Sequence, residues 1–432
     1  MIDRFTLGAL EPARILVGLW QVADMERTGP LDTDKAAERL VAYADAGFDT
    51  FDMADHYGTA ELIAARARKD RPGALAFTKW CPPPGPMTAD VVRAGITERC
   101  KRLGTDTIDL LQFHWWSFDH PAWLDALHEL KALRDEGVIR ELGVTNFDAA
   151  HLRVALSDGV PIASNQVSFS LIDRRAREDL AVLCADTGTK LLGYGTLCGG
   201  FLTDRWLGQP EPDDVPDWSG MKYRRFIETA GGWDALQQVL RAAKAVGDRH
   251  GASIANVATR WVLDHPHVGG IIIGARLGER EHRADTAQLL DLQLTDEDRA
   301  TLDAAFGALH PIPGDCGDEY RKPPFLTASG DLSHHLSTMP RAYEAAPVPG
   351  RPERQRVSSG SVWEPLAGFS RAVRVGDRIL VSGTTATQGA DRVVARDDAG
   401  AQTSYILDKI LAAIAALGGV PEDVVRTRIM LA

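Results

Sequence analysis

Four polar residues of the kinds that reduce a carbonyl group stand at or just after the ends of predicted strands. Asp52, Lys79 and His114 each close a short apolar run, and Tyr57 lies in the loop after Asp52. Hydride transfer to a carbonyl carbon leaves negative charge on the oxygen, which then needs a proton. A tyrosine can supply it, and a nearby ammonium lowers the pKa of a phenol from about 10. We therefore expect Tyr57 to be the general acid.

The other three residues have supporting roles in this chemistry. We expect Lys79 to lower the pKa of Tyr57 and Asp52 to pair with Lys79, compensating its burial. We expect His114 to hydrogen-bond the substrate oxygen and orient the carbonyl. Taken singly, the four also fit ordinary roles as a cap, a packed ring, a solvated charge and a rim histidine. Their shared position favours catalysis, because functional groups of a parallel barrel collect at the C-terminal ends of its strands.

Eight short apolar runs alternate with amphipathic helical patterns through the first 275 residues. Runs that are apolar on both faces are typical of strands in a parallel sheet. The alternation predicts an α/β fold, a (β/α)8 TIM barrel with an outer ring of helices. The predicted strands are Ile15–Trp20, Thr50–Met53, Ala74–Trp80, Thr107–His114, Ile139–Thr145, Ile162–Val167, Lys190–Thr196 and Gly270–Gly274.

Motifs around the four residues match those of a known family. They are Asp52 to Gly58 (DMADHYG) with Glu61, Phe77 to Lys79 (FTK), Ile108 to Trp115 (IDLLQFHW) and Gly137 to Phe147 (GVIRELGVTNF). In this order they resemble the aldo-keto reductase family, from about residue 5 to residue 309. The resemblance implies a catalytic tetrad of Asp52, Tyr57, Lys79 and His114, with NADPH or NADH as hydride donor.

The same resemblance implies a cofactor site across the barrel mouth. Thr145, Asn146 and Gln166 match the residues that bind the nicotinamide carboxamide, and Tyr194 matches the aromatic residue that stacks on the ring. A Rossmann domain is not expected, because no GxGxxG motif stands at a strand-to-helix turn.

The remaining cofactor contacts are predicted on the loops after the seventh and eighth strands. Glycines in the first loop permit close approach of backbone amides to a pyrophosphate. Arginines in the second loop match the region that holds the adenosine 2′-phosphate and favour NADPH, since guanidinium groups bind phosphate bidentately, while NADH remains possible. The residues concerned are Gly195, Leu197, Gly199, Gly274, Arg276 and Arg280.

Aromatic residues are predicted to line the substrate side of the mouth. Trp20, His56, Trp115 and Trp116 stand next to the catalytic positions, and they suit a mostly apolar or ring-bearing carbonyl compound. The substrate itself stays open. The long stretch 203–232 either folds over the mouth or is a solvated insertion.

Residues 311–355 are rich in Pro and Gly and are interpreted as a linker between a barrel over 1–310 and a second unit over 356–432. In that unit we expect strands over 372–375, 378–382 and 424–431 and a helix over 402–417. Its motifs are Gly376 to Thr384 (GDRILVSGT), Gln402-Thr403, Leu417 to Gly419 (LGG) and Asp423 to Arg428 (DVVRTR).

These motifs resemble the RidA family of small α+β, chorismate mutase-like domains, whose members form trimers and hydrolyse enamine and imine intermediates. The later half of that family's pattern would fall beyond Ala432, so we expect a partial RidA-like domain. Such a fragment should pack on the barrel or self-associate with another chain, because it leaves an apolar face and sheet edges uncovered. No activity is assigned to it.

Composition narrows the remaining function classes. A net charge of −12 disfavours a nucleic-acid partner, and no apolar run spans a membrane. The N-terminus lacks a secretory signal, which predicts a cytoplasmic protein whose partner is a small carbonyl substrate. Five scattered cysteines without CxxC spacing predict neither a zinc site nor disulfides, and no metal is expected. Two alternatives stay open, namely a nucleotide-binding module like the potassium-channel β subunits and a bifunctional protein coupling reduction to enamine or imine handling.

Overall fold

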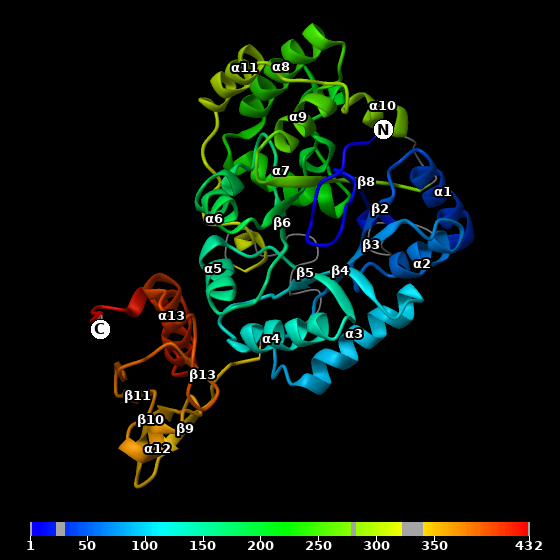
Figure 1. The fold of residues 1–432 in the computed structure, drawn as a ribbon. Helices are drawn as coiled ribbons and strands as arrows, with labels where there is room; N and C mark the ends of the chain where they lie inside the picture. The colour runs from blue at the N-terminus through cyan, green and yellow to red at the C-terminus, as the bar shows by residue number, and fades with distance from the viewer. Residues whose placement is uncertain (1, 23–30, 278–281, 322–339, 431–432) are drawn as a thin grey trace.

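A computed structural model describes residues 2–22, 31–277, 282–321 and 340–430 of the chain. Eight parallel strands close into a barrel in chain order, from β1 to β8, and β8 pairs with β1 (Figure 1). The predicted TIM barrel and its eight strands are confirmed, with shifts of one to two residues at half of the strand ends. The strands are β1 (Ile15–Gly18), β2 (Thr50–Asp52), β3 (Leu75–Trp80), β4 (Ile108–His114), β5 (Ile139–Thr145), β6 (Ser164–Ser168), β7 (Lys190–Tyr194) and β8 (Val268–Gly274).

Helices surround this barrel and connect its strands. Several begin at a side-chain cap: at α11 the Thr295 hydroxyl accepts from the Asp298 amide at 3.2 Å, and the Asp298 carboxylate accepts from the Thr295 amide at 2.9 Å. None of the helices in the described part of the chain combines the length and apolar character that crossing a membrane requires. The helices are α1 (Thr33–Asp45), α2 (Ala60–Asp70), α3 (Ala89–Leu103), α4 (Ala122–Asp135), α5 (Ala149–Ser157), α6 (Asp179–Thr187), α7 (Trp218–Thr229), α8 (Gly232–His250), α9 (Ile254–Leu263), α10 (Arg283–Gln288) and α11 (Asp296–Phe306).

The N-terminal end of the barrel is filled by apolar side chains. Leu7 and Leu10, from a short N-terminal hairpin, pack with Leu16, Phe77 and other strand residues in a separate buried cluster. Packing of this kind stabilises the barrel and leaves the opposite end, where the strands terminate, for chemistry.

The stretch 310–321 packs against the barrel, although its Pro and Gly content predicts a free linker over 311–355. Ile312 and Cys316 are buried in the main core, and Glu319 is fully buried. The first strand of the C-terminal sheet also begins inside the predicted linker, at Ala345. Buried apolar side chains and ion pairs therefore hold this stretch in place, and its composition alone does not reveal them.

The C-terminal unit contains a four-stranded antiparallel sheet in the order β12-β11-β10-β9 and a two-stranded β13-β14 pair. The predicted strand over 424–431 is not formed: residues 424–430 are irregular, and Val425 is 97% exposed, with no strand among the described residues to pair with. The elements are β9 (Ala345–Val348), β10 (Arg351–Val357), α12 (Trp363–Ala367), β11 (Ala372–Val375), β12 (Arg378–Val381), β13 (Thr387–Gln388), β14 (Arg392–Val393) and α13 (Ala399–Ala416).

Helix α13 docks this unit on the barrel beside α5, with α4 close by (Figure 1). Ala401 and Tyr405 of α13 are fully buried in the same hydrophobic cluster as the barrel helices. Around them, Arg153 contacts Asp398 at 2.8 Å, and Arg392 contacts Asp158 at 2.7 Å. The expectation that the unit packs on the barrel thus agrees with the structure.

His151 of α5 links the two units through a pair of carboxylates. Its Nδ1 lies 2.7 Å from Asp148 Oδ1, and its Nε2 lies 3.0 Å from Asp408 Oδ2 of α13. Burial alone would lower the pKa of His151, but the charges of Asp148 and Asp408 raise it to about 9. The imidazolium therefore stabilises the docked arrangement at neutral pH.

We predict that this contribution to stability is fully present below about pH 6.5 and is lost as the pH rises through about 9, because the pKa is raised in the folded state. The free energy of unfolding should fall by up to roughly 3 kcal/mol across this interval. Thermal unfolding of the wild type and of His151→Gln between pH 6 and pH 10 measures the effect. The variant should show a flatter dependence, and an equal slope in both proteins would refute the assignment.

Candidate active site

A buried ion pair lies at the C-terminal ends of β2 and β3. Lys79 Nζ is 2.8 Å from Asp52 Oδ2 and also donates to the Met53 carbonyl at 3.0 Å. The Lys79 and Asp52 side chains are only 5% and 4% exposed. Two charges so far from water require hydrogen bonds on every side.

Two glutamines meet that requirement on the other oxygen of Asp52. Gln112 Nε2 and Gln166 Nε2 donate to Asp52 Oδ1 at 3.0 and 2.7 Å, and Gln166 also donates to Gln112 Oε1 at 2.8 Å. Sequence reasoning missed Gln112. Its position two residues before His114 on β4 was the available signal, because alternate residues of a strand point to the same face.

Tyr57 lies against this pair at the start of the loop region after β2. Its ring centroid is 5.2 Å from Lys79 Nζ, and it packs edge-on against Trp20 at 4.9 Å and His56 at 4.8 Å. The Tyr57 hydroxyl makes no hydrogen bond with any residue that the structure describes, so it is available to a ligand.

The pKa of Tyr57 is raised rather than lowered, in contrast to the sequence-based expectation. Burial is the main cause, and the charge of Asp52 is the next. Lys79 lies 2.8 Å from Asp52, so the two opposite charges largely cancel at Tyr57 and burial remains the dominant effect. A phenol with a raised pKa keeps its proton at neutral pH, which a general acid for reduction requires.

His114 ends β4 close to these residues and is 4% exposed. Its ring lies 4.2 Å from Trp116 and 5.7 Å from Tyr320, measured between centroids. Trp115 points away from this group: it is fully buried, packs on Phe113 at 5.7 Å and donates to the His120 carbonyl. Of the two tryptophans predicted to wall the mouth, Trp116 is therefore the one that contacts His114 and His56.

The residues predicted to bind the nicotinamide carboxamide meet at the ends of β5, β6 and β7. Thr145 Oγ1 donates to the Gln166 carbonyl at 2.9 Å, and the Tyr194 hydroxyl donates to Asn146 Oδ1 at 2.8 Å. Asn146 Nδ2 and Gln166 Oε1 make no hydrogen bonds within the described part of the chain. These groups offer the donor and acceptor that a carboxamide ligand requires.

The loop after β7 approaches α7 closely at two glycines. Gly195 and Gly199 have φ of 69° and 66°, and a side chain at either would meet Tyr223. Leu197 lies between them, next to a short 3-10 turn over Cys198–Gly200. The two glycines therefore let this loop and α7 pack closely, which larger residues would prevent.

The predicted phosphate-binding residues are placed only in part. Gly274 ends β8 and Arg276 follows it, and both are exposed. Arg280 lies outside the described residues. The structure thus brings together the tetrad, Trp20, His56 and the residues predicted to bind the nicotinamide carboxamide. Gly274 and Arg276 lie at the edge of the barrel.

A second buried polar cluster at the mouth was not predicted. Lys222 of α7 donates to the Tyr320 hydroxyl at 2.7 Å and lies 3.5 Å from Glu319, which also pairs with Arg175 at 2.9 Å. Burial alone would raise the pKa of Glu319, but the charges of Arg175 and then Lys222 lower it. The stretch 203–232 thus contributes a helix at the mouth rather than a solvated insertion. No local pattern signals this cluster, since its parts come from distant segments.

Arg321 fastens residues 310–321 to the barrel. Its guanidinium donates to the carbonyls of Asn146 at 2.6 Å and Trp115 at 2.7 Å, and it lies over the Phe118 ring at 4.3 Å. Residues 315–321 consequently form part of the mouth, next to His114 and Tyr194.

We predict that Glu319→Gln lowers the free energy of unfolding by about 3 kcal/mol, because it leaves the buried Lys222 without a carboxylate partner, whereas Arg175 keeps Asp173 at 2.7 Å. Asp135→Asn is the matched control, since it removes a 2.7 Å pair with Lys131 that is about half exposed and should cost far less stability. Chemical denaturation of both variants gives the two values. Equal losses would contradict the proposed importance of burial.

Comparison with known proteins places this arrangement in a family. The aldo/keto reductase family model matches residues 14–306, and the model described as Endoribonuclease L-PSP matches residues 360–432. Aldo-keto reductase YhdN of Bacillus subtilis is 28% identical over 339 residues, 73% of this chain and 96% of that protein. The NADH-specific methylglyoxal reductase of Escherichia coli is 26% identical, over 67% of this chain and 93% of its own length.

A third relative matches over a shorter stretch: flagellar radial spoke protein 5 of Chlamydomonas reinhardtii is 35% identical over 37% of this chain, which spans 34% of that protein. Among solved structures, a glycerol dehydrogenase from Gluconobacter oxydans superposes with a TM-score of 0.61 at 23% identity, over 72% of this chain and 98% of its own. Both the barrel and its motifs therefore agree with the family model, and the C-terminal unit is RidA-like. This chain belongs to the aldo/keto reductase family of oxidoreductases.

Proposed function

We propose that this chain reduces an aldehyde or ketone to an alcohol, with Tyr57 as the general acid. The observation that carries the proposal is the buried Asp52–Lys79 pair at 2.8 Å, with the Tyr57 ring 5.2 Å from the ammonium. The ammonium stabilises the phenolate that Tyr57 becomes after giving up its proton, and Asp52 keeps the ammonium in place.

A carbonyl substrate would meet two groups at the mouth. Tyr57 presents its hydroxyl proton to the substrate oxygen, and His114 offers a ring nitrogen that orients the same oxygen. Negative charge then develops on the substrate oxygen as the carbon is reduced. Transfer of the Tyr57 proton to that oxygen completes the alcohol.

A nicotinamide cofactor, when bound, supplies the hydride for this reaction. Asn146 and Gln166 would hold its carboxamide through the amide atoms that are not engaged with described residues, and Tyr194 offers a ring beside them. The loop from Gly195 to Gly199 would bind the pyrophosphate through its backbone amides. Arg276 favours NADPH because a guanidinium binds the 2′-phosphate.

Aromatic surface around Tyr57 supports an apolar or ring-bearing substrate. Between ring centroids, Trp20 lies 4.9 Å from Tyr57 and 6.3 Å from His56, and His56 lies 6.3 Å from Trp116. Trp20 is held by a hydrogen bond from its Nε1 to Ser219 of α7 at 3.1 Å. Tyr320 adds a hydroxyl on the opposite side, next to His114.

Replacing Tyr57 by phenylalanine is expected to lower kcat for aldehyde reduction by about 100-fold to 10,000-fold, because it removes only the proton donor. The dissociation constant for NADPH should stay within about twofold of the wild type. Steady-state rates with a panel of aryl and alkyl aldehydes, and cofactor binding by fluorescence, measure the two quantities. Tyr405→Phe, a buried tyrosine at the α13 interface, is the control and should keep full activity.

Full turnover by Tyr57→Phe would refute the assignment of Tyr57 as the general acid. Tight NADPH binding by a wild type that turns over none of the panel would instead make the chain a nucleotide-binding module.

The preference for NADPH predicts a selective effect at Arg276. Arg276→Ala should raise the KM for NADPH about tenfold and leave the KM for NADH unchanged, since only NADPH carries the 2′-phosphate. Arg241→Ala, on the exposed side of α8, is the matched control. A wild-type KM that is lower for NADH, as expected of an NADH-specific enzyme, would refute the preference.

A further inference from the structure

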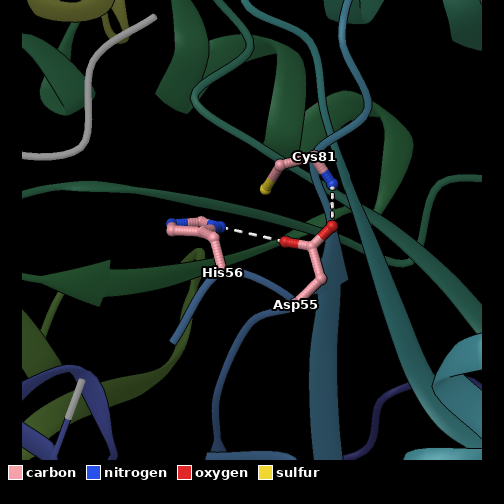
Figure 2. Close-up of side chains that lie close together, drawn as sticks. All are labelled: Asp55, His56 and Cys81. Carbon is pink, nitrogen blue, oxygen red and sulfur yellow. Dashed lines mark hydrogen bonds and ion pairs between the residues drawn. The ribbon is translucent and has the colours of Figure 1, made fainter. Parts of the chain in front are cut away.

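Three potential metal ligands meet beside the catalytic mouth. Asp55 and His56 come from the loop after β2, and Cys81 follows β3 directly. One ligand atom of each lies within 4.8 Å of the other two. Figure 2 shows the Asp55 carboxylate next to the imidazole, at 2.9 Å from Nδ1, with the Cys81 thiol directed to the same side.

The carboxylate in this cluster is held from behind by other groups. Asp55 Oδ2 accepts from the Cys81 amide at 2.8 Å and lies 3.4 Å from Arg99, while Oδ1 faces His56. Glu61 balances the charge of Arg99 at 3.2 Å. Such outer contacts orient ligands and are a regular feature of metal sites.

The combination of thiolate, imidazole and carboxylate is a ligand set for Zn²⁺, with bonds of about 2.0–2.3 Å. Tetrahedral binding places the ligand atoms roughly 3.5 Å apart, so side-chain movements of about 1 Å suffice here. The Asp55 and His56 side chains are 13% and 16% exposed, which leaves an entry path for an ion. Binding would release the thiol proton to solvent, and two negative charges would then face the dication.

We propose that Asp55, His56 and Cys81 bind a zinc-type transition-metal ion, and that the bound ion inhibits carbonyl reduction. The His56 ring packs edge-on against Tyr57 with centroids 4.8 Å apart, so the ion would lie close to the proposed acid. A hydrated ion held there would occupy the space that a carbonyl substrate needs beside the Tyr57 hydroxyl. The inhibition rests on the proposed function, whereas the binding does not.

This site could not be predicted from the spacing of cysteines in the sequence. Asp55 and His56 are adjacent, but Cys81 lies on the next βα loop and has no cysteine partner in a CxxC pattern. The barrel brings the two loops together, because consecutive parallel strands end side by side.

Cobalt binding to the metal-free full-length chain tests the site without reference to activity. One equivalent of Co²⁺ should produce a thiolate-to-cobalt charge-transfer band in the near ultraviolet, which Zn²⁺ then displaces. Cys81→Ser should abolish the band and weaken Zn²⁺ binding more than about tenfold. Cys100→Ser, which alters another half-buried thiol, should keep both. His56→Gln is a second variant that should weaken binding if Cys81→Ser fails to fold.

Measuring the aldehyde-reduction rate with and without Zn²⁺ distinguishes inhibition from binding alone. Zn²⁺ should reduce the aldehyde-reduction rate of the wild type and of Cys100→Ser at least about tenfold, reversibly with EDTA, and leave Cys81→Ser unaffected. Equal metal binding by the wild type, Cys81→Ser and His56→Gln would overturn the site. A cobalt band with undiminished reduction would overturn the inhibition. A chain that reduces no carbonyl but shows the band would refute the proposed function and keep the metal site.

Discussion

A buried ammonium and carboxylate remain stable together only when every hydrogen-bonding atom around them is satisfied, and this constraint organises the mouth of the barrel. Asp52 accepts from Lys79 on one oxygen and from two glutamines on the other. These donors come from β3, β4 and β6, so one carboxylate ties three strands to β2. Tyr57 and His114 are placed by the same strands, and the chemistry of the mouth depends on this single arrangement.

Much of this could be predicted because it depends on local patterns. Strands buried on both faces read as apolar runs, and each tetrad residue ends such a run or follows it, so their common position follows from barrel topology. The faces of individual side chains could not be predicted where a strand gives way to a loop. Trp115 and Trp116 are neighbours in sequence, but Trp115 packs on Phe113 in the core, whereas Trp116 packs on His114 at the mouth.

Contacts between distant segments were the main features that the sequence did not reveal. Residues 310–321 look like a linker by composition, but Glu319, Tyr320 and Arg321 make ion pairs and hydrogen bonds with β5, α7 and the loop after β6. The pKa of Tyr57 was mispredicted for a related reason. Its direction depends on burial and on the nearby charge of Asp52, which only the three-dimensional arrangement provides.

Deuterium transfer tests the central claim, that this mouth carries out hydride reduction, most directly. The full-length chain would be mixed in a single turnover with an aromatic aldehyde and NADPH deuterated at the transferable C4 position, and the alcohol examined by mass spectrometry and NMR. We predict an alcohol that carries the deuterium on the former carbonyl carbon, together with oxidised cofactor. Unchanged aldehyde with the cofactor bound and still reduced would contradict it.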